Sequence, residues 1–330
     1  MTAATTNESS LVFDPYDYDF HEDPYPTYAR LRDEDPLHYA PADDLWVLSR
    51  HEDILAALRD DVDLSNKMGV SLDASAWNSE AHRVMSFLAL DGAEQTRLRK
   101  LVSAAFTPRR VQDLRPTVQR LADQYLDAAL IKNETEGEID WIADFAGLLP
   151  MDVISEMMGV PVEDRVEVRR LADLVVHRED GVRDVPVAGM EAAFALIEYY
   201  SAMVAQRRIT PSEDLTSELV QAEINGDKLT DSEIIAFLFL MVVAGNETTT
   251  KLLGNALLHL GADPVQRARC SPTPSWSSRG SRRPCGTTPP ARWSPGTSPT
   301  TSRSTAAPFP PAPSWCSCSA RRTATRTSST

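Results

Sequence analysis

The sequence predicts a mainly α fold with a small β-sheet. Apolar residues recur every three or four positions over most of the chain from Ala93 onward, which is the spacing of one helix face. Two short runs near the N-terminus, residues 37–39 and 45–48, are typical of strands. Eleven consecutive apolar residues, Ile234 to Ala244, lie inside a longer helical pattern.

The N-terminal part is predicted to form a strand pair that leads into a helix. A short helix pattern at Tyr28 to Leu31 precedes the two strands, Leu37 to Tyr39 and Leu45 to Leu48. Ser49 and Glu52 then fit a capping box. The helix that follows is expected to turn three apolar side chains inward: Ile54, Leu55 and Leu58.

The middle of the chain reads as a series of amphipathic helices. Thr107-Pro108 is expected to end one helix and start the next. The stripe expected to be buried in the first is Leu98, Leu101, Val102 and Ala105. The recurring set in the second is Val111, Leu114, Val118, Leu121 and Tyr125. Three amphipathic stretches follow: Phe145 to Met158, Arg165 to Val176 and Met190 to Val204.

A long buried helix is predicted from Leu229 to Leu260. Thr230 and Glu233 fit a capping box at its start, and Leu229 can pack against Ile234 as a hydrophobic staple. At about 1.5 Å per residue, a helix of about thirty residues is about 45 Å long. Because its central run is apolar on all sides, we expect that run to be buried.

The composition changes abruptly near residue 264. After Gln266 the sequence contains no Asp, Glu, Lys, Leu, Ile, Met, Asn, Tyr or His. Residues 265–330 hold ten of the 33 basic residues and none of the 48 acidic ones, so the body carries a net charge of −25 and the tail +10. A tail so poor in aliphatic residues cannot offset its ordering entropy, so we expect a body at 1–264 and a disordered tail at 265–330.

Composition excludes several classes of protein. The acidic body lacks a clustered basic surface, so we expect no nucleic-acid partner. The polar start does not resemble a signal peptide, and the apolar run at 234–244 is too short to span a bilayer, so we expect a cytoplasmic protein and no membrane contact. All four cysteines lie in the tail, and Cys316 and Cys318 are too close for a usual zinc pair, so no metal site is predicted.

The long helix turns polar at residues 244–250, Ala-Gly-Asn-Glu-Thr-Thr-Thr. Buried carboxylates and hydroxyls are costly unless they are paired or used. Gly245 leaves room for a flat ligand against the backbone, and Thr248 can donate to the carbonyl of Ala244 and open or bend the helix. Two interpretations remain open: a solvated or interhelical polar patch, and a functional site.

The segment Asp227 to Thr250 resembles the long central helix of the cytochrome P-450 family, with its Ala-Gly-x-Glu-Thr signature. In that family the helix covers the distal face of the haem. The resemblance implies that Glu247 and Thr248 form the catalytic proton relay. It also implies that Ala244 and Gly245 form the wall on the oxygen side.

A second segment, Leu90 to Arg99, resembles the start of the family's helix that holds a haem propionate. The resemblance implies that Arg99 binds the propionate, which suits its planar fork, and that Gln95 stands where the family has a histidine. Further stretches of family likeness are Asp23 to Arg32, Trp46 to Leu58, Phe106 to Val111 and Phe145 to Pro161. The resemblance therefore implies a P-450-like fold, truncated after the long central helix.

The family's later essentials, a Glu-x-x-Arg pair and a loop carrying the haem-ligating cysteine, are absent as written. One nucleotide string that encodes Ser281 to Pro289 reads, shifted by one base, as Glu-Glu-Thr-Leu-Arg-Tyr-Asp-Thr, which restores the pair. The same shift turns Cys270 to Pro274 into Leu-Ala-Asp-Pro and brings Ala-Asn-Arg-Asp out of residues 301–330. A one-base slip between Pro264 and Cys270 accounts for all three.

The resemblance implies a monooxygenase that inserts one oxygen atom of O2 into an apolar small molecule, with haem b and electrons from a ferredoxin-type partner. The family's cysteine thiolate holds the haem iron and promotes O–O cleavage. Because the chain as written lacks that cysteine, we expect it to bind haem poorly and to be inactive. The alternative is a non-catalytic helical fragment or an interaction module with a flexible basic tail.

Overall fold

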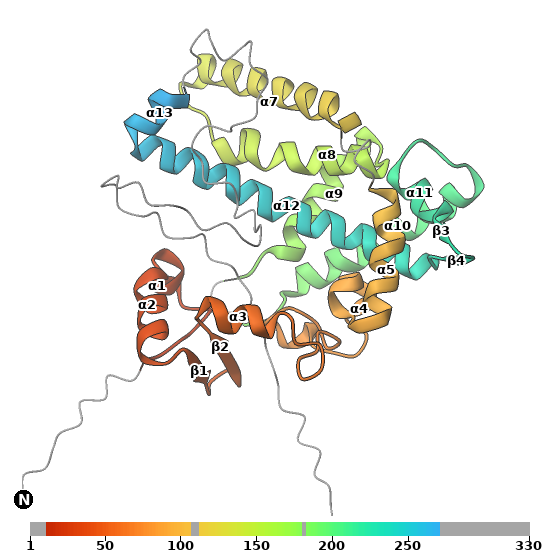
Figure 1. Ribbon diagram of the computed structural model, residues 1–330. Helices are drawn as coiled ribbons and strands as arrows, with labels where there is room; N and C mark the ends of the chain where they lie inside the picture. The colour runs from red at the N-terminus through yellow and green to blue at the C-terminus, as the bar shows by residue number, and fades with distance from the viewer. Residues whose placement is uncertain (1–10, 107–111, 180–182, 271–330) are drawn as a thin grey trace, which may run out of the picture. The chain divides into compact units, whose positions relative to one another are not determined.

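The computed structural model describes residues 11–106, 112–179 and 183–270, and the expected break at Thr107-Pro108, Val111 and most of the tail lie outside them. The described residues are mainly helical, with two sheets of two strands each (Figure 1). The predicted fold class is confirmed. The described residues form two compact units: the first comprises residues 11–106, 112–113, 155–179 and 183–243, and the second residues 114–154 and 244–270.

The N-terminal part of the first unit contains the expected strand pair. β1 (Leu37–Ala40) pairs antiparallel with β2 (Leu45–Leu48), with Leu37 opposite Leu48. The helices around the pair are α1 (Tyr18–Glu22), α2 (Tyr25–Glu34) and α3 (His51–Ala57).

The start and the end of α3 correct two predictions. The capping box of Ser49 and Glu52 is wrong, because Arg50 occupies the N-cap position without a side-chain cap. The Ser49 hydroxyl instead donates to the carbonyl of Pro36 at 3.4 Å, since that carbonyl lies across from it beside the strand pair. Leu58 is 58% exposed rather than turned inward, because α3 ends one residue before it.

The remaining elements of the first unit are mostly helices. They are η1 (Ala74–Ala76), α4 (His82–Met85), η2 (Ser86–Ala89), α5 (Gly92–Ala105), η4 (Val162–Asp164), α9 (Arg165–Val176), α10 (Val187–Ile209), α11 (Leu215–Gln221), β3 (Glu223–Ile224) and β4 (Asp227–Lys228). The predicted stripe of α5 is buried, and α9 matches its predicted bounds. The β3–β4 hairpin was not predicted, because two residues per strand leave no alternation to detect.

The second unit contains α7 (Arg115–Glu136), the π-helix η3 (Ile142–Ala146), the first part of α8 (Leu148–Met158), the end of the longest helix, and α13 (Pro264–Cys270). The predicted helix from Phe145 to Met158 is therefore two elements that meet at Gly147. On α7, Leu121 is buried as predicted, but Val118 is 37% exposed.

The long helix α12 (Asp231–Ala262) runs unbroken for 32 residues. Its capping box is confirmed: Glu233 accepts from the Thr230 amide at 2.8 Å, and Thr230 Oγ1 accepts from the Glu233 amide at 3.3 Å. Leu229 and Ile234 are both buried. The apolar run is buried at Ile234, Ala236–Phe239 and Val242, but Ala244 at its end is exposed, so the expectation of burial on every side is only partly met.

By length and composition alone, α12 could cross a membrane, because its most apolar window has a mean hydropathy of 1.3. The expectation that the apolar run is too short therefore holds for the eleven residues and not for the whole helix. Core helices pass the same test, and Ile234, Leu238 and Val242 pack inside the first unit. In all, 35% of that apolar window is buried.

Beyond α12, helical structure continues past the expected boundary at residue 264, because α13 extends to Cys270. The rest of the tail, including Cys285, Cys316 and Cys318, lies outside the described residues.

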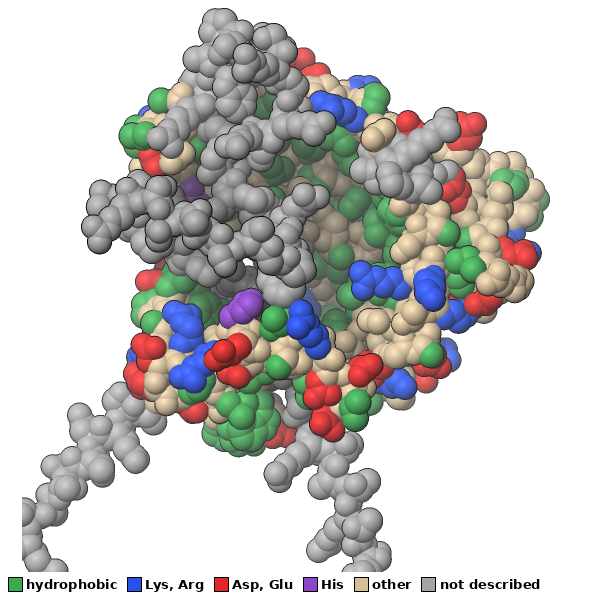
Figure 2. Space-filling model, viewed as in Figure 1, with side chains coloured by type: hydrophobic (Ala, Val, Ile, Leu, Met, Phe, Trp, Pro, Cys, Tyr) green, Lys and Arg blue, Asp and Glu red, His purple; other side chains and the backbone are tan. Residues whose placement is uncertain are grey.

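On the face drawn in Figure 2, the basic side chains are interspersed with acidic ones and form no continuous basic surface among the described residues.

Candidate functional site

Helix α5 carries the two residues predicted to hold a carboxylate. It buries Leu98, Leu101, Val102 and Ala105 on one side. Gln95 and Arg99 are four residues apart and therefore share another face of the helix. Gln95 is half-buried and Arg99 is exposed. The structure brings both to the same place.

Gln95 and Arg99 both line an open pocket of about 480 Å³ in the first unit. Its lining residues are Gln95, Thr96, Arg99, Lys100, Ser103 and Ile224. Within the described residues, neither Arg99 nor Lys100 makes an ion pair, and the side chain of Gln95 makes no hydrogen bond. Two cations and an amide are therefore available to an anionic ligand, and a planar guanidinium fork suits a carboxylate. We call this the Arg99 pocket.

A neighbouring arginine, Arg97, is fully engaged with protein groups. Its guanidinium donates to both carboxylate oxygens of Asp227, at 2.7 and 2.8 Å, and to the carbonyl of Lys228 at 3.0 Å. It also donates to Glu233 at the start of α12, at 2.5 Å. The hydrogen bonds with Asp227 and Glu233 raise the pKa of Arg97 above its ordinary value, and the bond from Arg97 lowers the pKa of Asp227. Arg97 thus joins α5, β4 and α12.

Sequence reasoning missed Arg97 because its partners lie 130 to 136 residues away, where no local pattern links them. The same cluster influences the pKa of Glu233. Burial by itself would raise that pKa, but hydrogen bonds from the Thr230 amide, Arg97 and the Thr230 hydroxyl outweigh burial and lower it. Glu233 therefore stays ionised between a helix N-terminus and a cation.

The polar segment of α12 lies in the second unit. Thr248 Oγ1 donates to the Ala244 carbonyl at 2.9 Å, as predicted, and the helix remains continuous through this bond. Glu247 forms an ion pair with Lys251, one turn further along. Sequence reasoning missed Lys251, although a Glu and a Lys spaced four apart are a recognised helix pair. Ala244 and Thr248 are exposed, and Gly245 and Glu247 are half-buried.

Gly245 lies against helix α8. A Cβ built on it would come 1.8 Å from Cδ1 of Ile154. The glycine therefore leaves room for the side chain of Ile154.

The π-helix η3 is fixed to the next turns of α12. Thr250 Oγ1 donates to the carbonyl of Ala146 at 3.0 Å, and the Trp141 indole donates to the carbonyl of Leu253 at 3.1 Å. These two bonds hold the start of η3 and its end. No sequence signal separated Thr250 from its neighbours Thr248 and Thr249.

The structure therefore gathers the predicted site residues into two groups. Gln95 and Arg99 line one pocket in the first unit, and Ala244, Gly245, Glu247 and Thr248 share one segment of α12 in the second.

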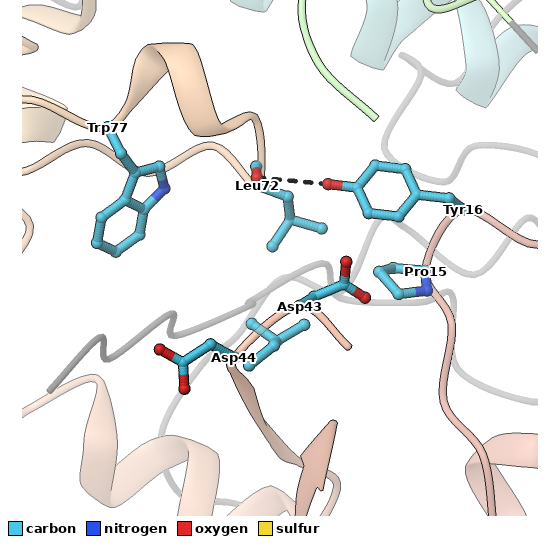
Figure 3. A pocket seen from close by; sticks show the side chains of 7 residues that line it. Pro15, Tyr16, Asp43, Asp44, Leu72 and Trp77 are labelled. Atoms are coloured by element: carbon cyan, nitrogen blue, oxygen red, sulfur yellow. Dashed lines mark hydrogen bonds between the residues drawn. The ribbon is translucent and has the colours of Figure 1, made fainter. Parts of the chain in front are cut away.

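A second, smaller pocket in the first unit is lined by acidic and aromatic side chains (Figure 3). Tyr16 donates to the carbonyl of Leu72 at 3.3 Å. Asp43 accepts from Arg183 at 2.6 Å, and Asp44 accepts from the Tyr39 hydroxyl at 2.8 Å. Because both carboxylates are already bonded to protein side chains, we interpret this pocket as structural.

Comparison with known proteins decides the family. A cytochrome P-450 of Mycobacterium marinum, solved in complex with pseudoionone, superposes with a TM-score of 0.67 at 31% identity, over 79% of this chain and 67% of that one. Cytochrome P-450 123 of Mycobacterium tuberculosis is 56% identical over 262 residues, which are 79% of this chain and 64% of the relative. The chain belongs to the cytochrome P-450 family. No family model matches it.

Another relative, the polyketide biosynthesis cytochrome P-450 PksS of Bacillus subtilis, is 37% identical over 261 residues, 76% of this chain and 63% of its own length. The chain thus spans a little under two thirds of the length of these two curated P-450 relatives. The predicted family resemblance and P-450-like fold are confirmed.

The residues present fit one end of the cofactor that the P-450 family implies. The Arg99 pocket offers a guanidinium, an ammonium group and an amide that no described residue engages, which suits a haem carboxylate. The family holds the haem iron with a cysteine thiolate, and the first cysteine of this chain is Cys270 at the end of α13. Because no cysteine precedes it, the fit of the residues before α13 to haem concerns only the carboxylate end of the cofactor.

Proposed function

We propose that the body of the chain is that of a cytochrome P-450 monooxygenase that inserts one oxygen atom of O2 into an apolar small molecule. Its cofactor is haem b, and its electrons come from a ferredoxin-type protein in the cytoplasm. The observation that carries this proposal is the 56% identity over 262 residues with cytochrome P-450 123. Relatives named for polyketide biosynthesis and solved with pseudoionone favour a small organic substrate.

Haem, when bound, supplies the chemistry that activates dioxygen. The chain supplies binding and protons. The Arg99 guanidinium binds a propionate through charge-assisted hydrogen bonds, and the Gln95 amide adds a neutral one. Both side chains line the Arg99 pocket, which supports this assignment.

On α12 we assign proton delivery to Glu247 and Thr248. The Glu247 side chain is 43% exposed, so its carboxylate is in contact with solvent as well as with Lys251. The Thr248 hydroxyl donates to the Ala244 carbonyl, which leaves its oxygen lone pairs free to accept a hydrogen bond. Ala244 and Gly245 carry no long side chains of their own, as the oxygen-side wall requires, and the side chain of Ile154 lies against Gly245.

We further propose that residues 265–330 come from a one-base slip and that the chain as written is inactive. The change in composition after Gln266 supports this, as does the return of Glu-x-x-Arg when the frame is shifted. The 262 residues that align with cytochrome P-450 123 are nearly as many as the residues before the break.

Nucleotide sequencing across the codons of Pro264 to Cys270 tests the slip. One base gained or lost relative to the family frame is expected. An unbroken frame that encodes this same tail would overturn the proposal and favour an interaction module with a basic extension.

Turnover by the frame-restored protein tests the proton relay. Glu247→Gln and Thr248→Ala are each expected to lower turnover by about a hundredfold at unchanged haem content, the usual scale for a lost general acid. Thr249→Ala is the matched control, since Thr249 is adjacent and exposed. Equal effects from all three variants would remove the assignment.

A further inference from the structure

The β3–β4 hairpin cannot hold its own position. Each strand has two residues, joined by Asn225 and Gly226 with φ of +54° and +85°, the conformation of a tight hairpin turn. Inside the hairpin, one ion pair joins Lys228 to Glu223 at 2.9 Å. Two-stranded hairpins are marginal in water even when longer, so this one depends on contacts to other elements.

Arg97 supplies such contacts from α5. Its three hydrogen bonds to the hairpin engage both residues of β4, namely the carboxylate of Asp227 and the carbonyl of Lys228. A bidentate guanidinium–carboxylate pair fixes orientation as well as distance. Arg97 therefore sets where the hairpin lies against α5.

The hairpin in turn forms one wall of the Arg99 pocket. Five of the six lining residues come from α5, and the sixth, Ile224, comes from β3. Ile224 is paired in register with Asp227, the residue that Arg97 holds. A shift of Asp227 away from α5 would carry Ile224 with it and open the pocket.

We infer that Arg97 is the positioning residue of the Arg99 pocket: by clamping the β3–β4 hairpin to α5, it holds Ile224 as the apolar wall beside the cations that receive a ligand carboxylate. The inference rests on the proposed function, in that the ligand is a tetrapyrrole propionate. It adds a residue that does not touch the ligand. Because Arg97 also binds Glu233, the same clamp ties the pocket to the start of α12.

Two variants separate positioning from simple charge. Asp227→Asn and Glu233→Gln each remove one negative charge next to Arg97. Removing an acid near a cationic pocket should strengthen anion binding by electrostatics alone. If the clamp positions the wall, Asp227→Asn weakens binding instead, because the hairpin loses its bidentate anchor. Glu233→Gln leaves the hairpin anchored and is the matched control.

The test titrates the full chain with protoporphyrin IX, followed by its fluorescence anisotropy, with Arg99→Gln and the dimethyl ester of the porphyrin as references. Wild type should bind the diacid more tightly than the ester, and Arg99→Gln should lose this preference. Arg97→Gln and Asp227→Asn are expected to weaken binding by about threefold to tenfold, the scale of re-ordering one or two freed groups. Arg97→Lys should restore part of the loss, and Glu233→Gln should bind at least as tightly as wild type.

Far-UV circular dichroism of each variant verifies that the helices remain. Binding of Asp227→Asn as tight as that of Glu233→Gln would overturn the positioning role while leaving the pocket intact. If wild type shows no preference for the diacid over its ester, or Arg99→Gln keeps the preference, the assignment of the pocket to propionate fails instead. The two failures are therefore distinguishable.

Discussion

Gly245 leaves room for the side chain of Ile154: a Cβ on the glycine would stand 1.8 Å from Cδ1 of the isoleucine. A side chain at position 245 of α12 would therefore require the end of the Ile154 side chain, on α8, to shift. The Ala-Gly-Asn-Glu-Thr segment thus has a packing requirement for glycine in addition to any requirement of the chemistry.

We predict that Gly245→Ala destabilises the protein. Overpacking costs about 1–3 kcal/mol, and the better helix propensity of alanine returns about 1 kcal/mol. Urea unfolding measures the difference. Gly261→Ala, near the end of the same helix with nothing within 4 Å of its Cβ, is the control and should be neutral or stabilising. Ile154→Val removes the opposing methyl group and should relieve Gly245→Ala in the double variant, and additive losses would contradict the account.

The buried pair of Arg207 and Asp214 should matter far more than its exposed neighbour. Arg207 Nε donates to Asp214 at 2.6 Å with side chains 13% and 6% exposed, and Asp214 also caps α11 through the Ser217 amide. We predict that Asp214→Asn costs about 3 kcal/mol, as expected when a buried cation loses its partner.

The control for that pair is the next arginine on α10. Arg208 binds Asp231, with side chains 40% and 55% exposed. Asp231→Asn should cost less than about 1 kcal/mol, because water screens the pair. Similar losses in the two variants, measured by urea unfolding, would show that burial is not the deciding factor.

The hydrogen bond from Thr250 to the carbonyl of Ala146 should contribute to stability. Thr250→Val keeps the shape of the side chain and removes the donor, so we expect a loss of about 1 kcal/mol. Thr249→Val is the matched control, since Thr249 is exposed on the same helix. If thermal unfolding of the two variants is the same, η3 is held by other contacts.

The pH dependence of stability should include Asp144. Lys132 donates to its carboxylate at 2.9 and 3.0 Å, and this bond lowers the pKa of Asp144 below its ordinary 3.8. A lowered folded-state pKa stabilises the protein above the unfolded-state pKa, and the benefit is lost as pH falls through the folded value. The stability gap between wild type and Asp144→Asn should therefore be constant above about pH 5 and shrink below pH 3.8 in urea titrations. A gap that widens in acid would contradict the pairing.

Local patterns predicted the elements that depend on local chemistry. The capping box of Thr230 and Glu233, the buried stripe of α5 and the bond from Thr248 to Ala244 all involve residues at most seven positions apart. The capping box at Ser49 fits the same pattern and is wrong, because a carbonyl at Pro36 offered the hydroxyl another partner. A local sequence motif alone cannot show which of two possible hydrogen-bond partners the hydroxyl takes.

The parts of the site that could not be predicted from the sequence depend on residues far apart in the chain. Arg97 and Arg99 stand two positions apart, yet one is bound by acids about 130 residues away and the other is left for a ligand. The family likeness selected Arg99 and passed over Arg97. The wall formed by Ile224 depends on a hairpin too short to leave a pattern.

We propose that this chain has a cytochrome P-450 body and lacks the cysteine that ligates the haem iron. The carbon-monoxide difference spectrum of the purified, reduced chain after addition of haemin tests it most directly, with the frame-restored protein measured alongside. We expect the thiolate-type band from the frame-restored protein and none from the chain as written. A thiolate-type band from the chain as written would contradict the account.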